Sequence, residues 1–189
     1  MPTIDIFPMG QIDDFLAYRL ACCLEERFLF KFQVQRTQPF PRFAYNNIKK
    51  QYFAPAILKK TKNIRSEGSG YAIGLVDVDI YGISNNFIIG ETNVSDGVAL
   101  VSLCRLKPDF YGHSSDDDVL FQRALKECIH ELSHAMGLKH CYNRICVMHY
   151  STNIFDIDKK RNLLCSECLR RMKEKVGHPQ GKKADDTLS

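Results

Sequence analysis

The chain has 189 residues, a length typical of one globular domain with a substantial hydrophobic core. Hydrophobic residues make up 44% and charged residues 25% of it, which excludes a disordered or fibrous protein, and the formal net charge of +4 is too small to indicate nucleic-acid binding. The N-terminal residues lack the pattern of a secretory signal, and no apolar run approaches the ~20 residues of a membrane span. We therefore expect a cytoplasmic protein without a nucleic-acid or membrane partner. The sequence leaves the oligomeric state open, with a monomer as the default.

The spacing of apolar residues divides the chain into strands and helices. The first part predicts a strand, a helix, a half-buried strand and a second helix, over residues 3–7, 11–28, 29–35 and from Pro55 onward. Three strand candidates follow, over 72–80, 87–94 and 98–106. A long helix is predicted over about 117–136, with Ser115 and Asp118 as its capping box, and a basic helix over 169–175. This order predicts an α/β protein with a mixed twisted sheet.

Residues 45–64 combine basic and aromatic side chains. Such a composition can bind single-stranded nucleic acid, but it is more often the solvated face of a helix. We therefore interpret this segment as a surface helix and its connection.

The long predicted helix carries histidines at the spacing that a metal site needs. His130 and His134 are four residues apart, so they lie on one helix face and can reach the same ion. Glu131 lies beside the first histidine, where it can hold the reacting water. Gly137 permits a left-handed turn that ends the helix and can bring His140 back to the metal. Three nitrogen ligands leave a fourth position open, as in catalytic zinc sites.

A second cluster follows directly. Cys141, Cys146, Cys165 and Cys168 form a Cys-x4-Cys pair and a Cys-x2-Cys pair, the pattern of a closed, structural zinc site. The alternatives are a disulfide and a thioredoxin-like redox motif at the second pair. A protein without an export signal keeps its thiols reduced, and we therefore favour zinc.

The other four cysteines have no metal-binding spacing. Cys22 and Cys23 lie on the first predicted helix, near its apolar face, and we expect both in the core. Cys128 precedes the first histidine by two residues and could be a ligand or redox switch, but a buried helix position favours a core role. No role is indicated for Cys104.

The two clusters together resemble the archaemetzincin family of zinc metalloproteases. The resemblance rests on the pattern His-Glu-x2-His-x2-Gly-x2-His-Cys-x4-Cys-x-Met over residues 130–148 and on the Cys-x2-Cys pair at 165–168. The loop between these parts is one residue shorter than the usual family pattern.

The resemblance implies a metzincin-like fold in a single domain, residues 1–189. Residues 1–137 would form an upper subdomain with the sheet and the zinc helix. Residues 138–176 would form a lower subdomain with the third histidine, the Met-turn and the four-cysteine zinc. The composition of residues 177–189 predicts a disordered tail.

The resemblance also implies a zinc peptidase that acts on peptides or proteins, with two zinc ions per chain and Glu131 as general base. Met148 would form the Met-turn, a position that also suits an ordinary core methionine. Tyr150 resembles a tyrosine that approaches the zinc in astacins and would stabilise an oxyanion; a packed aromatic role is the alternative. Residues 87–94 are the candidate edge strand for an extended substrate.

A different class of function is also compatible with the sequence. The protein could be a zinc-binding regulatory or interaction module whose site is occluded by residues 45–64 or by the tail. The sequence leaves open whether the peptidase is an endopeptidase or an aminopeptidase.

Overall fold

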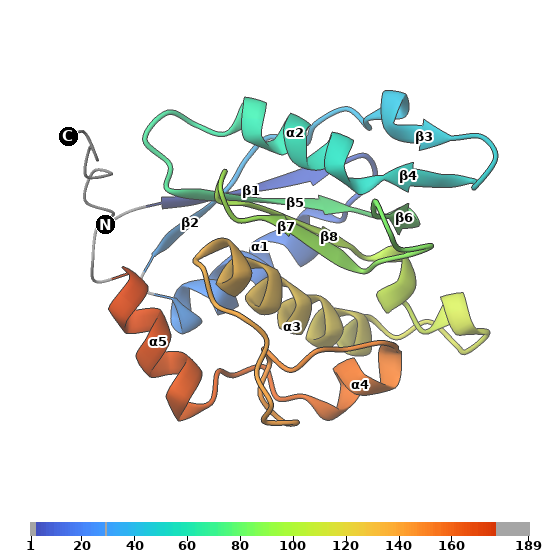
Figure 1. Ribbon diagram of the computed structural model, residues 1–189. Coiled ribbons are helices and arrows are strands. Elements are labelled where there is room, and N and C mark those ends of the chain that lie inside the picture. The colour runs from blue at the N-terminus through green and yellow to red at the C-terminus, as the bar shows by residue number, and fades with distance from the viewer. Residues whose placement is uncertain (1–2, 29, 177–189) are drawn as a thin grey trace, which may run out of the picture.

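A computed structural model describes residues 3–28 and 30–176 (Figure 1). Its centre is a five-stranded sheet in the order β2-β1-β5-β8-β7. The first four strands are parallel, and β7 joins β8 in the antiparallel sense at the edge. The strands are β1 (Thr3–Met9), β2 (Lys31–Val34), β5 (Tyr71–Val76), β7 (Gly90–Asn93) and β8 (Val98–Ser102). The expectation of an α/β protein with a mixed sheet is therefore confirmed.

Helices cover both faces of this sheet, so its central strands are buried and almost wholly apolar. Figure 1 shows α2 on one face and α1 with α3 on the other. Their bounds are α1 (Asp14–Arg27), α2 (Ala54–Ile64) and α3 (Asp117–Ala135). Three short strands, β3 (Tyr45–Asn46), β4 (Gln51–Phe53) and β6 (Ile80–Tyr81), form a second sheet beside α2. The zinc-motif helix α3 thus lies against the sheet next to its edge strand.

The chain after Gly137 crosses below α3 with little regular structure (Figure 1). Between Gly137 and Val176, its helices are α4 (Ile154–Lys159) and α5 (Ser166–Val176). Short 3-10 turns occur earlier, at Arg42–Ala44, Cys104–Leu106 and Asp109–Tyr111. Outside α4 and α5, single backbone hydrogen bonds tie the segment after Gly137 together, such as those from the Cys141 N–H to the Met148 carbonyl and from the Val147 N–H to the Leu163 carbonyl.

Several expectations need correction. The strand expected over 98–106 ends at Ser102, because Leu103 has helical backbone angles and a 3-10 turn follows. The strand expected over 72–80 ends at Val76, and Ile80 begins β6, which belongs to the second sheet. Helix α3 is capped by Asp116, whose carboxylate accepts the backbone N–H of Val119 at 2.9 Å, and the Ser115 box does not form.

The cysteines of α1 also differ from expectation. Cys22 is exposed and Cys23 only half-buried. The buried positions of α1 recur three and four residues apart, at Ala17, Leu20, Ala21 and Leu24, and residue 22 is rotated off that face. Cys128 is buried in the core, as expected. The predicted tail, 177–189, lies outside the described residues. Within the described part of the chain, every helix is too short or too polar to cross a membrane.

Candidate active site

Three histidines converge at the C-terminal end of α3. His130 and His134 lie one turn apart on the helix, and the turn after it returns His140 to them. The imidazole centroids are 4.6 Å apart for His130 and His134, 4.7 Å for His134 and His140, and 5.3 Å for His130 and His140. One nitrogen from each ring lies within 4.8 Å of the other two. The arrangement brings three ligand atoms around one point.

Backbone carbonyls fix which nitrogen of each ring faces that point. His130 Nδ1 lies 2.8 Å from the Val147 carbonyl, and His134 Nδ1 lies 2.7 Å from the Leu138 carbonyl. A carbonyl can only accept, so both Nδ1 atoms carry the proton and both Nε2 atoms present a lone pair. These two Nε2 atoms are 3.1 Å apart. Two lone pairs at this distance repel unless a cation lies between them. Zinc–nitrogen bonds of ~2.0–2.1 Å in a tetrahedron separate two ligand nitrogens by about 3.3 Å, so the donor set fits zinc.

The electrostatic environment keeps these rings neutral. Burial lowers the pKa of His130 and His134, and the positive charge of Lys160 adds to this effect, while the hydrogen bonds to the backbone carbonyls oppose it. Burial and the neighbouring His134 lower the pKa of His140. A neutral imidazole is the form that binds a metal. The site therefore favours metal over protons at neutral pH.

Glu131 is held against the edge strand β7. Its side chain is only 7% exposed, and the Thr92 hydroxyl donates to its Oε2 at 2.6 Å. Gly90 lies against the same carboxyl, since a Cβ at position 90 would be 2.6 Å from Glu131 Cγ and 2.7 Å from Oε1. Burial outweighs the Thr92 hydrogen bond and raises the pKa of Glu131 to about 8. Sequence reasoning missed both β7 residues, although a glycine inside a strand often marks such a close approach.

A buried ion pair lies one helical turn before Glu131. Lys160, at the end of α4, places its Nζ 3.4 Å from Glu127 Oε1 and 3.3 Å from the His149 carbonyl. Lys160 is 3% exposed and Glu127 5%. Burial raises the pKa of Glu127, and the lysine charge opposes that shift. The spacing of Glu127 and Glu131 on one helix face was visible in the sequence, whereas nothing there pointed to Lys160.

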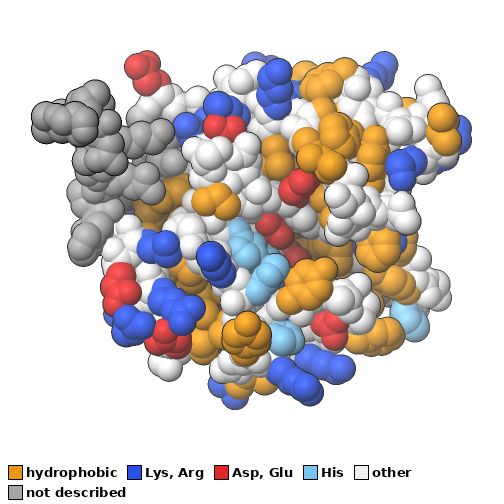
Figure 2. Space-filling model, viewed as in Figure 1, with side chains coloured by type: hydrophobic (Ala, Val, Ile, Leu, Met, Phe, Trp, Pro, Cys, Tyr) orange, Lys and Arg blue, Asp and Glu red, His pale blue; other side chains and the backbone are white. Residues whose placement is uncertain are grey.

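These groups open into a cleft of about 650 Å³ between β7 and the chain after the third histidine. Figure 2 shows the histidines in a hollow on this face, bordered by hydrophobic side chains. The lining residues that concern the chemistry are Gly90, Thr92, Glu127, His130, Glu131, His134, His140 and Tyr150. Residues 45–64 do not line it. The segment suspected of blocking the site therefore lies elsewhere.

The remaining predicted site residues surround the histidines. Gly137 has φ +89°, the left-handed angle that the helix-ending turn requires. Met148 is fully buried in the core, directly after the residue whose carbonyl holds His130. The ring of Tyr150 lies edge-on to His140, with 5.0 Å between centroids, and is 55% exposed.

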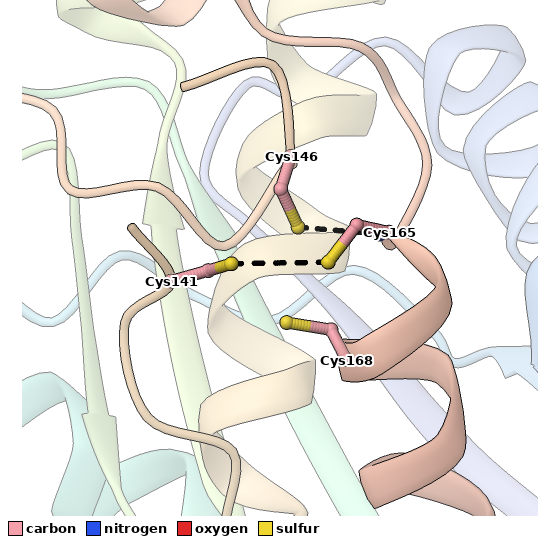
Figure 3. Close-up of side chains that lie close together, drawn as sticks. All are labelled: Cys141, Cys146, Cys165 and Cys168. Atoms are coloured by element: carbon pink, nitrogen blue, oxygen red, sulfur yellow. Dashed lines mark hydrogen bonds between the residues drawn. The ribbon is translucent and has the colours of Figure 1, made fainter. Parts of the chain in front are cut away.

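The four cysteines of the second cluster point their sulfurs at one another (Figure 3). All four sulfurs lie within 4.8 Å, and Cys141 Sγ is 3.8 Å from Cys165 Sγ. Zinc–sulfur bonds of ~2.3 Å in a tetrahedron give a sulfur–sulfur distance of about 3.8 Å. Backbone N–H groups donate to Cys141 Sγ and Cys146 Sγ, which suits thiolates. All eight cysteines are free in the structure, which therefore contains no disulfide between the members of this cluster.

Comparison with known proteins identifies the family. Residues 35–174 match the model of peptidase family M54. The chain belongs to this family. It is 39% identical to the archaemetzincin of Pyrococcus furiosus over 92% of this chain and 94% of that one, and 37% identical to that of Methanocaldococcus jannaschii over 91% and 93%. The crystal structure of the Methanopyrus kandleri archaemetzincin superposes with a TM-score of 0.82 at 26% identity, covering 94% of this chain and 96% of that one.

A zinc-dependent peptidase from Methanocorpusculum labreanum superposes equally well, with a TM-score of 0.82 at 25% identity, over 89% of this chain and 99% of that one. The resemblance to archaemetzincins is thus confirmed, and the protein is a zinc metallopeptidase of family M54. As a peptidase it acts on peptide or protein substrates.

Proposed function

We propose that the protein holds two zinc ions, a catalytic one on His130, His134 and His140 and a structural one on the four cysteines. The observation that carries the catalytic assignment is the pair of unprotonated Nε2 atoms facing each other at 3.1 Å. Zinc bound there supplies a Lewis acid that polarises a peptide carbonyl and acidifies water. The matching sulfur–sulfur distance of 3.8 Å supports the second site. The cysteine zinc then fastens the lower subdomain, residues 138–176, to the upper subdomain, residues 1–137.

Glu131 acts as the general base in this proposal. Thr92 occupies Oε2 with its hydroxyl, which leaves Oε1 to accept the proton of the attacking water. The carboxyl group then delivers that proton to the departing amine. Its raised pKa suits both transfers, because a base works best when its pKa is near the working pH. Tyr150, exposed beside His140, is placed to donate its hydroxyl to the oxyanion. Met148 packs the turn that carries the Val147 carbonyl.

Strand β7 is the proposed docking edge for the substrate backbone. The Ser102 N–H donates to the Ile89 carbonyl at 2.8 Å. Antiparallel hydrogen bonding alternates along a strand, so Glu91 and Asn93 bond to β8, while Gly90 and Thr92 turn their N–H and C=O groups to the open edge. An extended peptide can pair with these groups and cross the cleft beside the histidines.

The test is Glu131→Gln, an isosteric change that removes the base. We expect the variant to retain wild-type zinc content, measured by mass spectrometry of the metal, and to lose hydrolysis of a peptide library. Glu26→Gln, on the exposed side of α1, is the matched control and should behave as wild type. Wild-type hydrolysis by Glu131→Gln would show that the base has been assigned wrongly. A wild-type content of one zinc or none would disprove the two-site arrangement.

A further inference from the structure

Glu91, the acidic residue of β7, is directed away from the histidine cleft. Gly90 and Thr92 face α3, and strand side chains alternate, so Glu91 faces the α2 side of the sheet. Its Oε2 is enclosed, and no donor among the described residues reaches it. Burial accordingly raises the pKa of this carboxyl group. A carboxylate removed from water without a partner is costly, and a cationic group brought to it would relieve that cost.

Glu91 lines a pocket of about 550 Å³ between α2 and the outer edge of β7. Figure 1 shows α2 and β7 along this side of the sheet. Thr92 and Val94 border both this pocket and the histidine cleft, so the two are adjoining spaces on either side of the edge strand. A substrate paired with β7 would send alternate side chains into the two spaces. The residue opposite Glu91 would be a neighbour of the one that enters the catalytic cleft.

We propose that this pocket is a specificity subsite that selects a lysine or arginine side chain of the substrate through the Glu91 carboxylate. The proposal rests on the proposed docking of the substrate along β7. In directly opposed positions of an antiparallel pair, Cβ atoms lie ~4.5–5.5 Å apart, and opposite charges there attract. Because carboxylate charge is shared by both oxygens, a cation at the accessible oxygen also stabilises the enclosed one.

The opposite wall of the pocket carries two lysines, and neither competes for this role. Lys62 already pairs with Asp96, with 2.6 Å between Nζ and Oδ1. Lys59 is exposed to solvent, so its ammonium group keeps its hydration without a partner. The group with most to gain from a ligand is therefore Glu91, and the pocket favours a basic side chain over an acidic one.

The test measures binding without turnover. N-acetylated, fluorescent peptides of one parent sequence, with lysine, norleucine or glutamate at successive positions, are titrated into zinc-loaded Glu131→Gln protein. At one position we expect lysine to bind about tenfold more tightly than norleucine, as one charge-assisted hydrogen bond allows. Adding Glu91→Gln should abolish this ratio, and Glu91→Lys should reverse it toward glutamate. Lys59→Gln is the matched control and should leave the ratio intact. Melting temperatures show whether each variant is folded. Glu91→Met, which removes both the charge and the enclosed polar group, is a second uncharged variant and should also abolish the ratio.

Three outcomes would overturn the proposal: an equal lysine preference with and without Glu91, no preference at any position, or a glutamate preference lost in Lys59→Gln. A second series of the same peptides carries a free N-terminus. A Glu91-dependent preference confined to that series would overturn the side-chain assignment, because the carboxylate would then bind the substrate's α-amino group. Because binding is read in a variant without the base, a failure of the proposed catalytic role leaves these readings unaffected. The same peptides given to the wild-type enzyme should show the ratio in kcat/KM.

Discussion

Gly90→Ala tests how closely the edge strand holds Glu131, the proposed general base. The added methyl group would lie 2.6 Å from Glu131 Cγ and 2.8 Å from its Cδ, where ordinary contacts begin at 3.4 Å. The β7 backbone is fixed by its pairing with β8, so the carboxyl group has to move. The required retreat is 3.4 minus 2.6, or 0.8 Å.

A displacement of this size can stretch the hydrogen bond from Thr92 to Glu131 from 2.6 Å to as much as about 3.4 Å, beyond the usual O–H···O range of ~2.5–3.0 Å. Misplacing a catalytic group by about 1 Å costs ~100-fold in rate, so kcat should fall by about two orders of magnitude. The crowded methyl group should also lower the free energy of unfolding by about 1–3 kcal/mol. Substrate affinity should change little, because alanine keeps the backbone groups that face the open edge.

The assay compares kcat and KM of wild type, Gly90→Ala and Gly82→Ala on one fluorogenic peptide. Gly82→Ala is the matched control for kcat, because its added methyl group would make only ordinary contacts, 3.6 Å from the Ile88 side chain and 3.9 Å from Glu91 Oε1, and would not touch Glu131. Zinc content is measured in each sample. The reasoning is refuted if Gly90→Ala keeps its kcat within twofold of wild type, or if both alanine variants lose activity equally.

Three further perturbations have defined outcomes. Replacing Cys165 and Cys168 by serine should lower the zinc content from two ions to one. It should also weaken zinc binding at the histidine site, because the cysteine cluster directly follows the third histidine. An unchanged zinc affinity of the histidine site in a competition titration would contradict that coupling. Lys160→Met leaves Glu127 buried without its partner and should lower the free energy of unfolding, measured in urea, by about 3–5 kcal/mol. Adding Glu127→Gln should recover most of this loss. If the double variant recovers none of it, the loss does not come from the unpaired Glu127. Burial raises the pKa of Asp79, but the hydrogen bonds it accepts outweigh this and lower its pKa below 3.8. Its contribution to stability is thus present above pH 3.8 and lost as pH falls through the lower, folded-state value, so Asp79→Asn should flatten the acid side of a stability–pH curve.

Local spacing was enough to predict the histidine site. His130 and His134 share a helix face because of the 3.6-residue period, and Gly137 supplies the left-handed turn. The residues that hold Glu131 could not be predicted, because they are distant from it in the sequence. Thr92 lies 39 positions away in the sequence, and its contact depends on how β7 pairs with β8. Which side chains of β7 face α3 and which face α2 is set by the pairing of the strands in the sheet and cannot be read from the segment alone.

The class of chemistry could be predicted from the sequence, because helix and turn geometry converts the spacing of ligand residues into their arrangement in space. The sequence also predicted the α/β class and an edge strand near residues 87–94, observed as Gly90–Asn93. The groups that surround the ligands depend instead on tertiary packing. The packing of α3 on the sheet brought Gly90 against Glu131, and the return of the chain placed Lys160 beneath the helix. Such contacts join segments far apart in the chain, and their partners are chosen by the global burial of apolar surface, which no local pattern records.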